Sequence, residues 1–155
     1  MYRDEILKLL VQYKCSFFIG VFALDELNFK VKKYPSCLVV NSHPRNMPGE
    51  HWIAVYIDKN KNGRYFDSYG FPPLQAEFYD FMSNNCVRWN FSTSVIQSGS
   101  SISCGEFCTF YIASRSIGLT HKDVIELFCK SRLQFNDDLV SLYLQLMAAH
   151  TRLMS

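Results

Sequence analysis

The chain has 155 residues, of which 48% are hydrophobic and 15% aromatic. This composition favours a packed globule over a disordered chain, and we expect residues 1–155 to form a single domain. Sixteen basic and fourteen acidic residues leave a formal net charge of +2. So small an excess does not support strong binding to nucleic acid through phosphate neutralisation, although a weak or accessory contact with DNA stays open.

The cysteine spacing and the lengths of the apolar runs indicate the cellular compartment of the protein and whether it binds a metal or a membrane. None of the cysteines forms a CxxC pair or a spacing typical of metal ligands. No apolar run approaches the roughly 20 residues of a membrane span, and the charged start of the chain does not resemble a signal peptide. We therefore expect a reducing, intracellular compartment, no membrane association and no bound metal. The six cysteines are Cys15, Cys37, Cys86, Cys104, Cys108 and Cys129.

In the first half of the chain, the pattern predicts one helix and three strands. Apolar residues with helical spacing predict a helix over 4–14, capped by Asp4. A buried strand is expected over 36–41, before a loop rich in proline and glycine. Strands over 51–58 and 64–68 form a hairpin around a turn at 59–63.

In the second half, helices dominate. A helix is expected over 74–84, with Pro73 near its start, and a strand over 87–96. Further helices are expected over 104–118, with Gly118 as its C-terminal cap, from about 120 onward, and from Asp137 or Asp138 to about Met154. This order predicts an α+β fold with a central, mostly antiparallel sheet flanked by helices.

Three residues with catalytic side chains fall at the ends of these elements. His51 begins one strand of the hairpin and Asp67 ends the other, so both lie at the same end of the sheet. Cys104 begins a helix, where the partial positive charge of the N-terminus stabilises a thiolate. A thiolate, a histidine base and a group that orients the histidine are the requirements of a cysteine nucleophile.

Gln97 supplies a fourth chemical group. The small polar residues 98–103 separate it from Cys104 and form a loop that lets a substrate backbone approach the thiol. Attack on an amide carbonyl creates an oxyanion, which the Gln97 side-chain amide and the Cys104 backbone N–H would stabilise.

Other interpretations apply to the same residues. A cysteine in an apolar helix is commonly a core residue, and we expect this of Cys108. A metal site made of Cys104, Cys108 and His51 is the competing chemistry. It leaves Gln97 and Asp67 without a role, and we expect no metal.

Several segments resemble the adenovirus proteinase (adenain) family, which is related to the SUMO-specific, Ulp-like proteases. The segment 41–52 (NSHPRNMPGEHW) resembles the family's loop that runs into His-Trp. The segment 65–71 (YFDSYGF) resembles its acidic residue followed by an aromatic-Gly-Phe turn. Gln97 and the segment 104–108 (CGEFC) resemble its glutamine and Cys-Gly-x-Phe-Cys motif, and 15–22 (CSFFIGVF) its N-terminal stretch.

The resemblance implies an adenain- or papain-like fold and a role for each matched residue. Cys104 would be the nucleophile, His51 the general base, Asp67 its orienter and Gln97 the oxyanion donor. The substrate-binding residues would be Trp52, Asn41, Gly49 and Gly105. Cys86 lies near the position of the cysteine that links an activating viral peptide, and DNA is a second activator in the family. The chain itself requires no cofactor.

The function expected from this resemblance is that of a viral, or virus-derived, cysteine endopeptidase. It would cleave capsid and core precursors after small, glycine-type residues, in the virion and the host nucleus. The alternatives are a SUMO- or ubiquitin-like isopeptidase and an inactive relative that acts as a binding module. Relative to the family, the chain departs in having Asp67 where adenoviral enzymes usually have glutamate, and in being shorter after Gly118.

Overall fold

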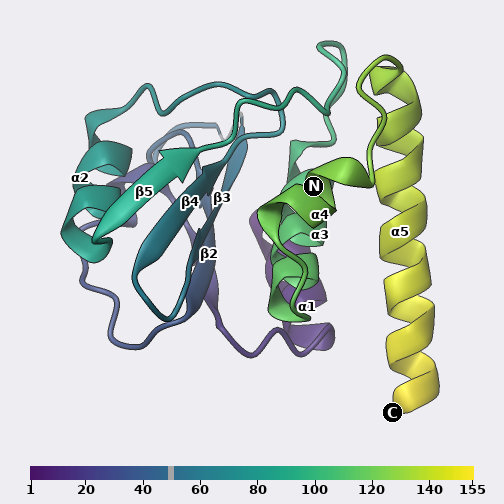
Figure 1. The fold of residues 1–155 in the computed structure, drawn as a ribbon, viewed down its shortest axis with the longest axis horizontal. Coiled ribbons are helices and arrows are strands. Elements are labelled where there is room, and N and C mark those ends of the chain that lie inside the picture. Colours follow the sequence, from purple (N-terminus) through teal and green to yellow (C-terminus); the bar gives the residue numbers. More distant parts are fainter. Residues whose placement is uncertain (49–50) are drawn as a thin grey trace.

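The computed structural model describes residues 1–48 and 51–155 and contains six helical segments and five strands in this part of the chain (Figure 1). The helical segments are α1 (Arg3–Gln12), the 3-10 helix η1 (Leu24–Glu26), α2 (Ala76–Asn85), α3 (Cys104–Ser116), α4 (His121–Glu126) and α5 (Leu133–Met154). The strands are β1 (Phe18–Phe22), β2 (Ser36–Asn41), β3 (Trp52–Ile57), β4 (Asn62–Phe66) and β5 (Arg88–Phe91).

The five strands form one sheet in the order β1-β2-β3-β4-β5. The three central strands are antiparallel, with Val39 opposite Ala54 and Ala54 opposite Phe66. Both outer strands pair in parallel, β1 with β2 and β5 with β4. The predicted α+β class is therefore confirmed, with an antiparallel centre and parallel edges.

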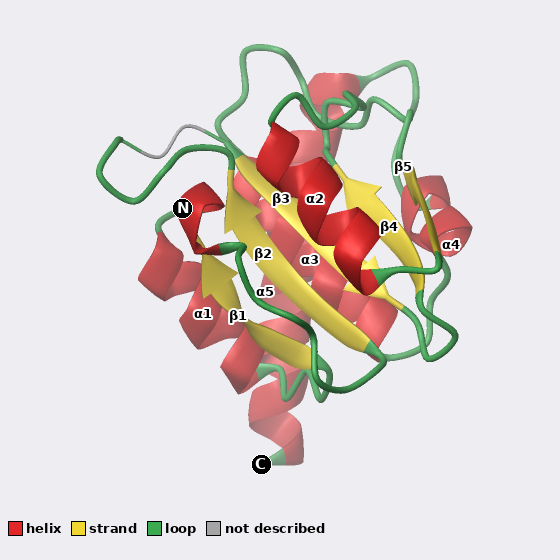
Figure 2. Ribbon diagram, turned by 90° about the vertical axis from the view of Figure 1, so that its left-hand side faces the viewer, coloured by secondary structure: helices red, strands yellow, loops and turns green. Residues whose placement is uncertain are grey.

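Helices cover both faces of the sheet. Figure 2 shows α2 in front of the sheet and α1, α3 and α5 behind it. In Figure 1 the same layers appear from the side, with α5 outermost beyond α1, α3 and α4. Each face of the sheet has its own apolar cluster, because alternate residues of the strands point to opposite sides.

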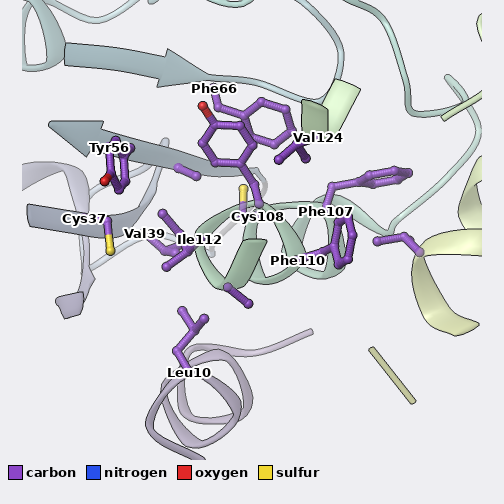
Figure 3. Close-up of a cluster of buried hydrophobic side chains, with 14 of the residues drawn as sticks. Leu10, Cys37, Val39, Tyr56, Phe66, Phe107, Cys108, Phe110, Ile112 and Val124 are labelled. Carbon is purple, nitrogen blue, oxygen red and sulfur yellow. The ribbon is translucent and has the colours of Figure 1, made fainter. Parts of the chain in front are cut away.

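The cluster behind the sheet is built around α3 (Figure 3). Ten of the thirteen residues of this helix are buried, so its apolar character, unlike that of an amphipathic surface helix, continues around its circumference. The Tyr111 ring stacks on Phe66 of β4, with ring centroids 4.2 Å apart and planes inclined by 4°. Cys108 is completely buried in the same cluster, in agreement with its predicted place in the core.

The positions of the predicted elements are mostly confirmed, but several ends differ. The cap of α1 is Tyr2, whose backbone N–H is bonded to the Glu5 carboxylate at 2.6 Å, so the prediction of Asp4 as the cap is wrong. The predicted strand 87–96 is shorter in the structure, where β5 covers Arg88–Phe91; at the end of the predicted range, the backbone N–H groups of Ile96 and Gln97 donate to the Ser68 carbonyl, which lies outside the strands. The last helix begins at Leu133, earlier than predicted.

One strand, β1, was not predicted. Its residues show no alternation in burial and include Gly20, at a φ of 148° that favours glycine. Its strand conformation follows from parallel pairing with the buried β2, a contact between distant segments that the local pattern does not reveal. Within the described residues, no helix has the length and apolarity needed to cross a bilayer.

We expect Phe66→Ala to lower the free energy of unfolding by about 3–5 kcal/mol, because the removed ring leaves a cavity against Tyr111. Chemical denaturation followed by circular dichroism would measure the change. The matched control is Phe135→Ala, since the Phe135 side chain is 52% exposed. Equal losses in the two variants would contradict the central role of the Phe66 contact.

Candidate active site

The structure brings His51, Asp67 and Cys104 together. His51 directly precedes β3 and Asp67 directly follows β4, and antiparallel pairing places both at one end of the sheet. The His51 Nε2 atom lies 2.9 Å from Asp67 Oδ1, and the ring nitrogen donates because a carboxylate accepts. Cys104 is the first residue of α3, and its thiol interacts with the His51 side chain closely enough for each group to shift the pKa of the other.

The Asp67–His51 contact is held in place by Tyr69. Asp67 Oδ1 also accepts the backbone N–H of Tyr69 at 2.8 Å. The Tyr69 ring stacks on the imidazole, with centroids 5.1 Å apart and planes inclined by 29°. Its hydroxyl in turn donates to the Ser101 carbonyl at 2.9 Å. The histidine is thus fixed at its edge by the carboxylate and on its face by an aromatic ring.

The surroundings favour a thiolate and an imidazolium. Burial raises the pKa of the Cys104 thiol, but hydrogen bonds from His51 and from the Trp52 and Gly105 backbone, with the His51 charge, bring the pKa below the ordinary value of 9.0. Burial lowers the pKa of His51, but hydrogen bonds and charge interactions with Asp67 and Cys104 raise it to about 9. Both pKa shifts favour the thiolate–imidazolium pair over a neutral thiol and a neutral imidazole.

Cys104 lines a groove with a volume of about 510 Å³ at this end of the sheet. Only 8% of the Cys104 surface is exposed. Trp52 and Asn41 line the groove as the resemblance implies. Other lining residues are Phe22, Ala23, His43, Pro44, Arg45, Met47 and Ile102.

Gln97 lies near the site but does not line the groove. Its side chain is completely buried. The amide nitrogen donates to the carbonyl and the hydroxyl of Ser101, at 3.3 and 3.2 Å, and the amide oxygen accepts the Ser68 hydroxyl. In this arrangement the loop 98–103 provides both partners of the Gln97 amide nitrogen, and Ser68 provides the partner of the amide oxygen.

The remaining predicted positions differ in their surroundings. Gly105 is buried, and a Cβ there would lie 2.8 Å from Met1 Cβ and 3.3 Å from Trp52 Cδ1, so it packs beneath the groove wall. Gly49 lies outside the described residues. Cys86 is half-buried behind Gly63, away from the groove, and burial together with the nearby Asp58 charge raises its thiol pKa to about 11.

The first residues of the chain form part of the groove, which the sequence pattern did not suggest. Met1, Tyr2 and Arg3 all line it. The indole N–H of Trp52 donates to the Met1 carbonyl at 3.0 Å, so the N-terminal segment fixes the orientation of the Trp52 ring. No local signal marks such a contact, because it joins residues 51 positions apart.

The fully buried Asn136 of α5 was also not predicted as a site-supporting residue. Its amide nitrogen donates to the Ile96 carbonyl at 2.9 Å and to the Cys129 carbonyl at 2.7 Å. Its oxygen accepts the Cys129 backbone N–H. This one side chain ties the residue before Gln97 to the start of α5.

The competing metal interpretation finds no support in the described part of the chain. No group of three His, Cys, Asp or Glu side chains there is arranged to hold a metal ion. Cys108 points into the core, where burial raises its thiol pKa well above the ordinary value. It is therefore a poor ligand partner for Cys104.

Comparison with known proteins agrees with this geometry. The adenovirus endoprotease family matches residues 18–128, a range that contains His51, Asp67, Gln97 and Cys104. The chain belongs to the adenovirus endoprotease family. The protease of bovine adenovirus 2 is 29% identical, over 71% of this chain and 61% of the relative. The chain thus spans less than two thirds of the length of this curated family member.

Solved structures support the fold. ChlaDub1 from Chlamydia trachomatis superposes on 76% of this chain and 61% of its own, with a TM-score of 0.51 and 19% identity. The central domain of Lpg1148 from Legionella pneumophila covers 86% of both chains, with a TM-score of 0.50 and 16% identity. This chain thus shares its fold with these bacterial proteins.

We expect an alkylating agent such as iodoacetamide to react with Cys104 at pH values where an ordinary thiol is protonated. Asp67→Asn should move this reaction to higher pH, because loss of the carboxylate lowers the His51 pKa and weakens the ion pair. Mass spectrometry of the labelled peptides across pH would measure the shift.

Cys129 is the internal control for this measurement. Hydrogen bonds with Ser131 lower the pKa of its thiol, so it also reacts readily, but it makes no contact with Asp67. Its labelling profile should be the same in both proteins. An unchanged Cys104 profile in Asp67→Asn would contradict the proposed coupling.

Proposed function

We propose that this chain is a cysteine endopeptidase in which Cys104, His51 and Asp67 form the catalytic triad. The proposal rests chiefly on one observation: the His51 Nε2 atom lies 2.9 Å from Asp67 Oδ1, and the same imidazole lowers the pKa of the Cys104 thiol. Membership of the adenovirus endoprotease family supports the reaction class.

In the first half of the reaction, the Cys104 thiolate attacks the carbonyl carbon of the scissile peptide. A C–S bond forms and the carbonyl oxygen takes up negative charge. When the tetrahedral intermediate collapses, the C–N bond breaks and the His51 imidazolium gives its proton to the leaving amine. The products are a thioester on Cys104 and a neutral imidazole.

In the second half, water hydrolyses the thioester. Neutral His51 takes a proton from the water as its oxygen attacks the thioester carbon. The C–S bond then breaks, which releases the carboxylic acid and restores the thiolate–imidazolium pair. Asp67 keeps the ring in the orientation required for both proton transfers and stabilises its positive charge.

The oxyanion would be stabilised by the Cys104 backbone N–H and the Gln97 amide. The Gln97 nitrogen donates to Ser101, and we propose that the oxyanion replaces Ser101 as its partner. Such an exchange requires movement of the loop 98–103, in which Ile102 is the one large side chain and is 87% exposed. The hydrogen bond to Ser68 keeps the amide plane fixed during the exchange.

The groove supports cleavage after small residues. Trp52 and Ile102 lie on the groove beside Cys104, and a substrate residue next to the scissile bond has to pass between such bulky side chains. We propose viral capsid and core precursors as substrates, in the virion and the infected nucleus. Activation by a viral peptide or by DNA remains a proposal from the family, and disulfide linkage at Cys86 would first require its half-buried thiol to be exposed.

The central test is cleavage of glycine-containing capsid-precursor peptides, with SUMO and ubiquitin conjugates as alternative substrates. We expect peptide cleavage, loss of activity in Cys104→Ala, and a decrease in kcat of about 100-fold or more in Asp67→Asn. Cleavage should decline above pH 9, as His51 loses the proton that the leaving amine needs.

Other outcomes would identify the alternatives. Processing of the conjugates without peptide cleavage would indicate an isopeptidase. Binding of the same partners by the wild-type protein and Cys104→Ala, without any cleavage, would indicate an inactive binding module. The control is Cys108→Ala, which alters a buried thiol on the same helix and should retain cleavage if the fold is intact.

We expect Gln97→Leu to lower kcat by about 100- to 1000-fold with a smaller effect on KM, because an oxyanion donor acts mainly in the transition state. Alkylation of Cys104 should persist, since it does not need the donor. Ser68→Ala is the companion variant, as it leaves the amide present but removes its tether. Full activity in Gln97→Leu would contradict the assigned role.

A further inference from the structure

A second concave site lies at the end of the sheet opposite to the catalytic groove. It has a volume of about 560 Å³, within the range of small-ligand pockets. Cys104 begins α3 and Arg115, which lines this pocket, lies eleven residues further along the same helix. At 1.5 Å per residue this separates the two sites by roughly 16 Å.

The strand register explains why basic side chains gather there. Tyr56 is opposite Arg64, and Arg64 is opposite Asn90, so these three side chains share one face of the sheet. Arg88 lies two residues before Asn90 and points to the same side. Arg115 and Lys122 approach this face from α3 and α4.

The pocket is more positively charged than the chain as a whole. Arg64, Arg88, Arg115 and Lys122 line it with a single carboxylate, Asp58. This local excess of three charges exceeds the net +2 of the whole sequence.

The nearby carboxylates do not neutralise the three arginines of the pocket, so their guanidinium groups can bind an anionic ligand. Asp58 accepts the backbone N–H groups of Asn60 and Asn62 in its own turn. Among the residues that the structure describes, none of the three arginines has a carboxylate within salt-bridge distance. Lys122 has an exposed partner, Glu126, at 3.7 Å, which contributes little.

The Arg115 guanidinium is held in place before any ligand binds. It lies over the Tyr56 ring, 4.0 Å from the centroid, and donates to the Tyr111 hydroxyl at 2.9 Å. The His121 ring nitrogen lies 3.1 Å from the same hydroxyl. Burial lowers the pKa of His121 to about 4, and the charges of Arg64 and Arg115 contribute to this shift.

We propose that this pocket binds a ligand with adjacent phosphate groups, through Arg64, Arg88, Arg115 and Lys122. Guanidinium groups form paired hydrogen bonds with phosphate oxygens, and several of them on one concave surface match more than one phosphate. The same chemistry is offered by a small polyphosphate and by the backbone of a nucleic acid. Binding here does not depend on the proposed peptidase activity.

The experiment measures binding of sodium tripolyphosphate by calorimetry at low ionic strength, with sulfate at the same concentration as reference. We expect Arg88→Gln and Lys122→Gln each to weaken binding by about tenfold. Both side chains are exposed, so these variants should fold. The matched control is Arg152→Gln, an exposed arginine near the end of α5. Cys104→Ala should bind as the wild type does, which separates this test from that of the peptidase.

A second measurement locates the ligand. Tripolyphosphate should raise the pKa of His121, followed by NMR, because it offsets the charges of Arg64 and Arg115. If a single-stranded oligonucleotide competes with tripolyphosphate for binding, the source of the phosphates is a nucleic acid. If it does not compete, the ligand is a small polyphosphate. Binding no stronger than that of sulfate, or equal weakening by Arg88→Gln and Arg152→Gln, would overturn the proposal.

Discussion

The position of Cys104 depends on the packing of α3 across the inner face of the central strands. The stacked rings of Phe66 and Tyr111 fix the helix against β4, and the same strand ends at Asp67. One packed layer therefore sets the distance between the sulfur at the helix start and the imidazole and carboxylate at the strand ends.

The sequence contained enough information to place the triad because each member sits at a boundary. A hairpin with a short turn has a defined register, so His51 and Asp67 had to lie together once both strands were recognised. The apolar run that follows Cys104 located the helix start in the same way. The structure confirms the proximity of the three groups, whereas their catalytic roles stay proposals.

The contacts that the sequence did not reveal join distant segments. The N-terminal wall of the groove and the parallel strand β1 both depend on contacts between distant segments. The local hydrophobic periodicity of a sequence does not report such contacts. For the same reason, the bulk charge gave no indication of the basic pocket: Arg64, Arg88 and Arg115 are separated in sequence and meet only through sheet register and helix packing. Gln97 was correctly placed before a loop, but its present bonds to Ser101 could not be foreseen.

The buried Asn136 makes α5 more than a cover for the core. This helix lies beyond the region shared with the adenoviral family. Its Asn136 side-chain amide nevertheless donates a hydrogen bond to the carbonyl of Ile96, the residue before Gln97. Replacement of α5 by another amphipathic helix would preserve the apolar packing, but it would remove the hydrogen bond between Asn136 and the Ile96 carbonyl. A terminal helix can thus change over most of its length, while one side-chain amide still connects it to the backbone of the candidate active site.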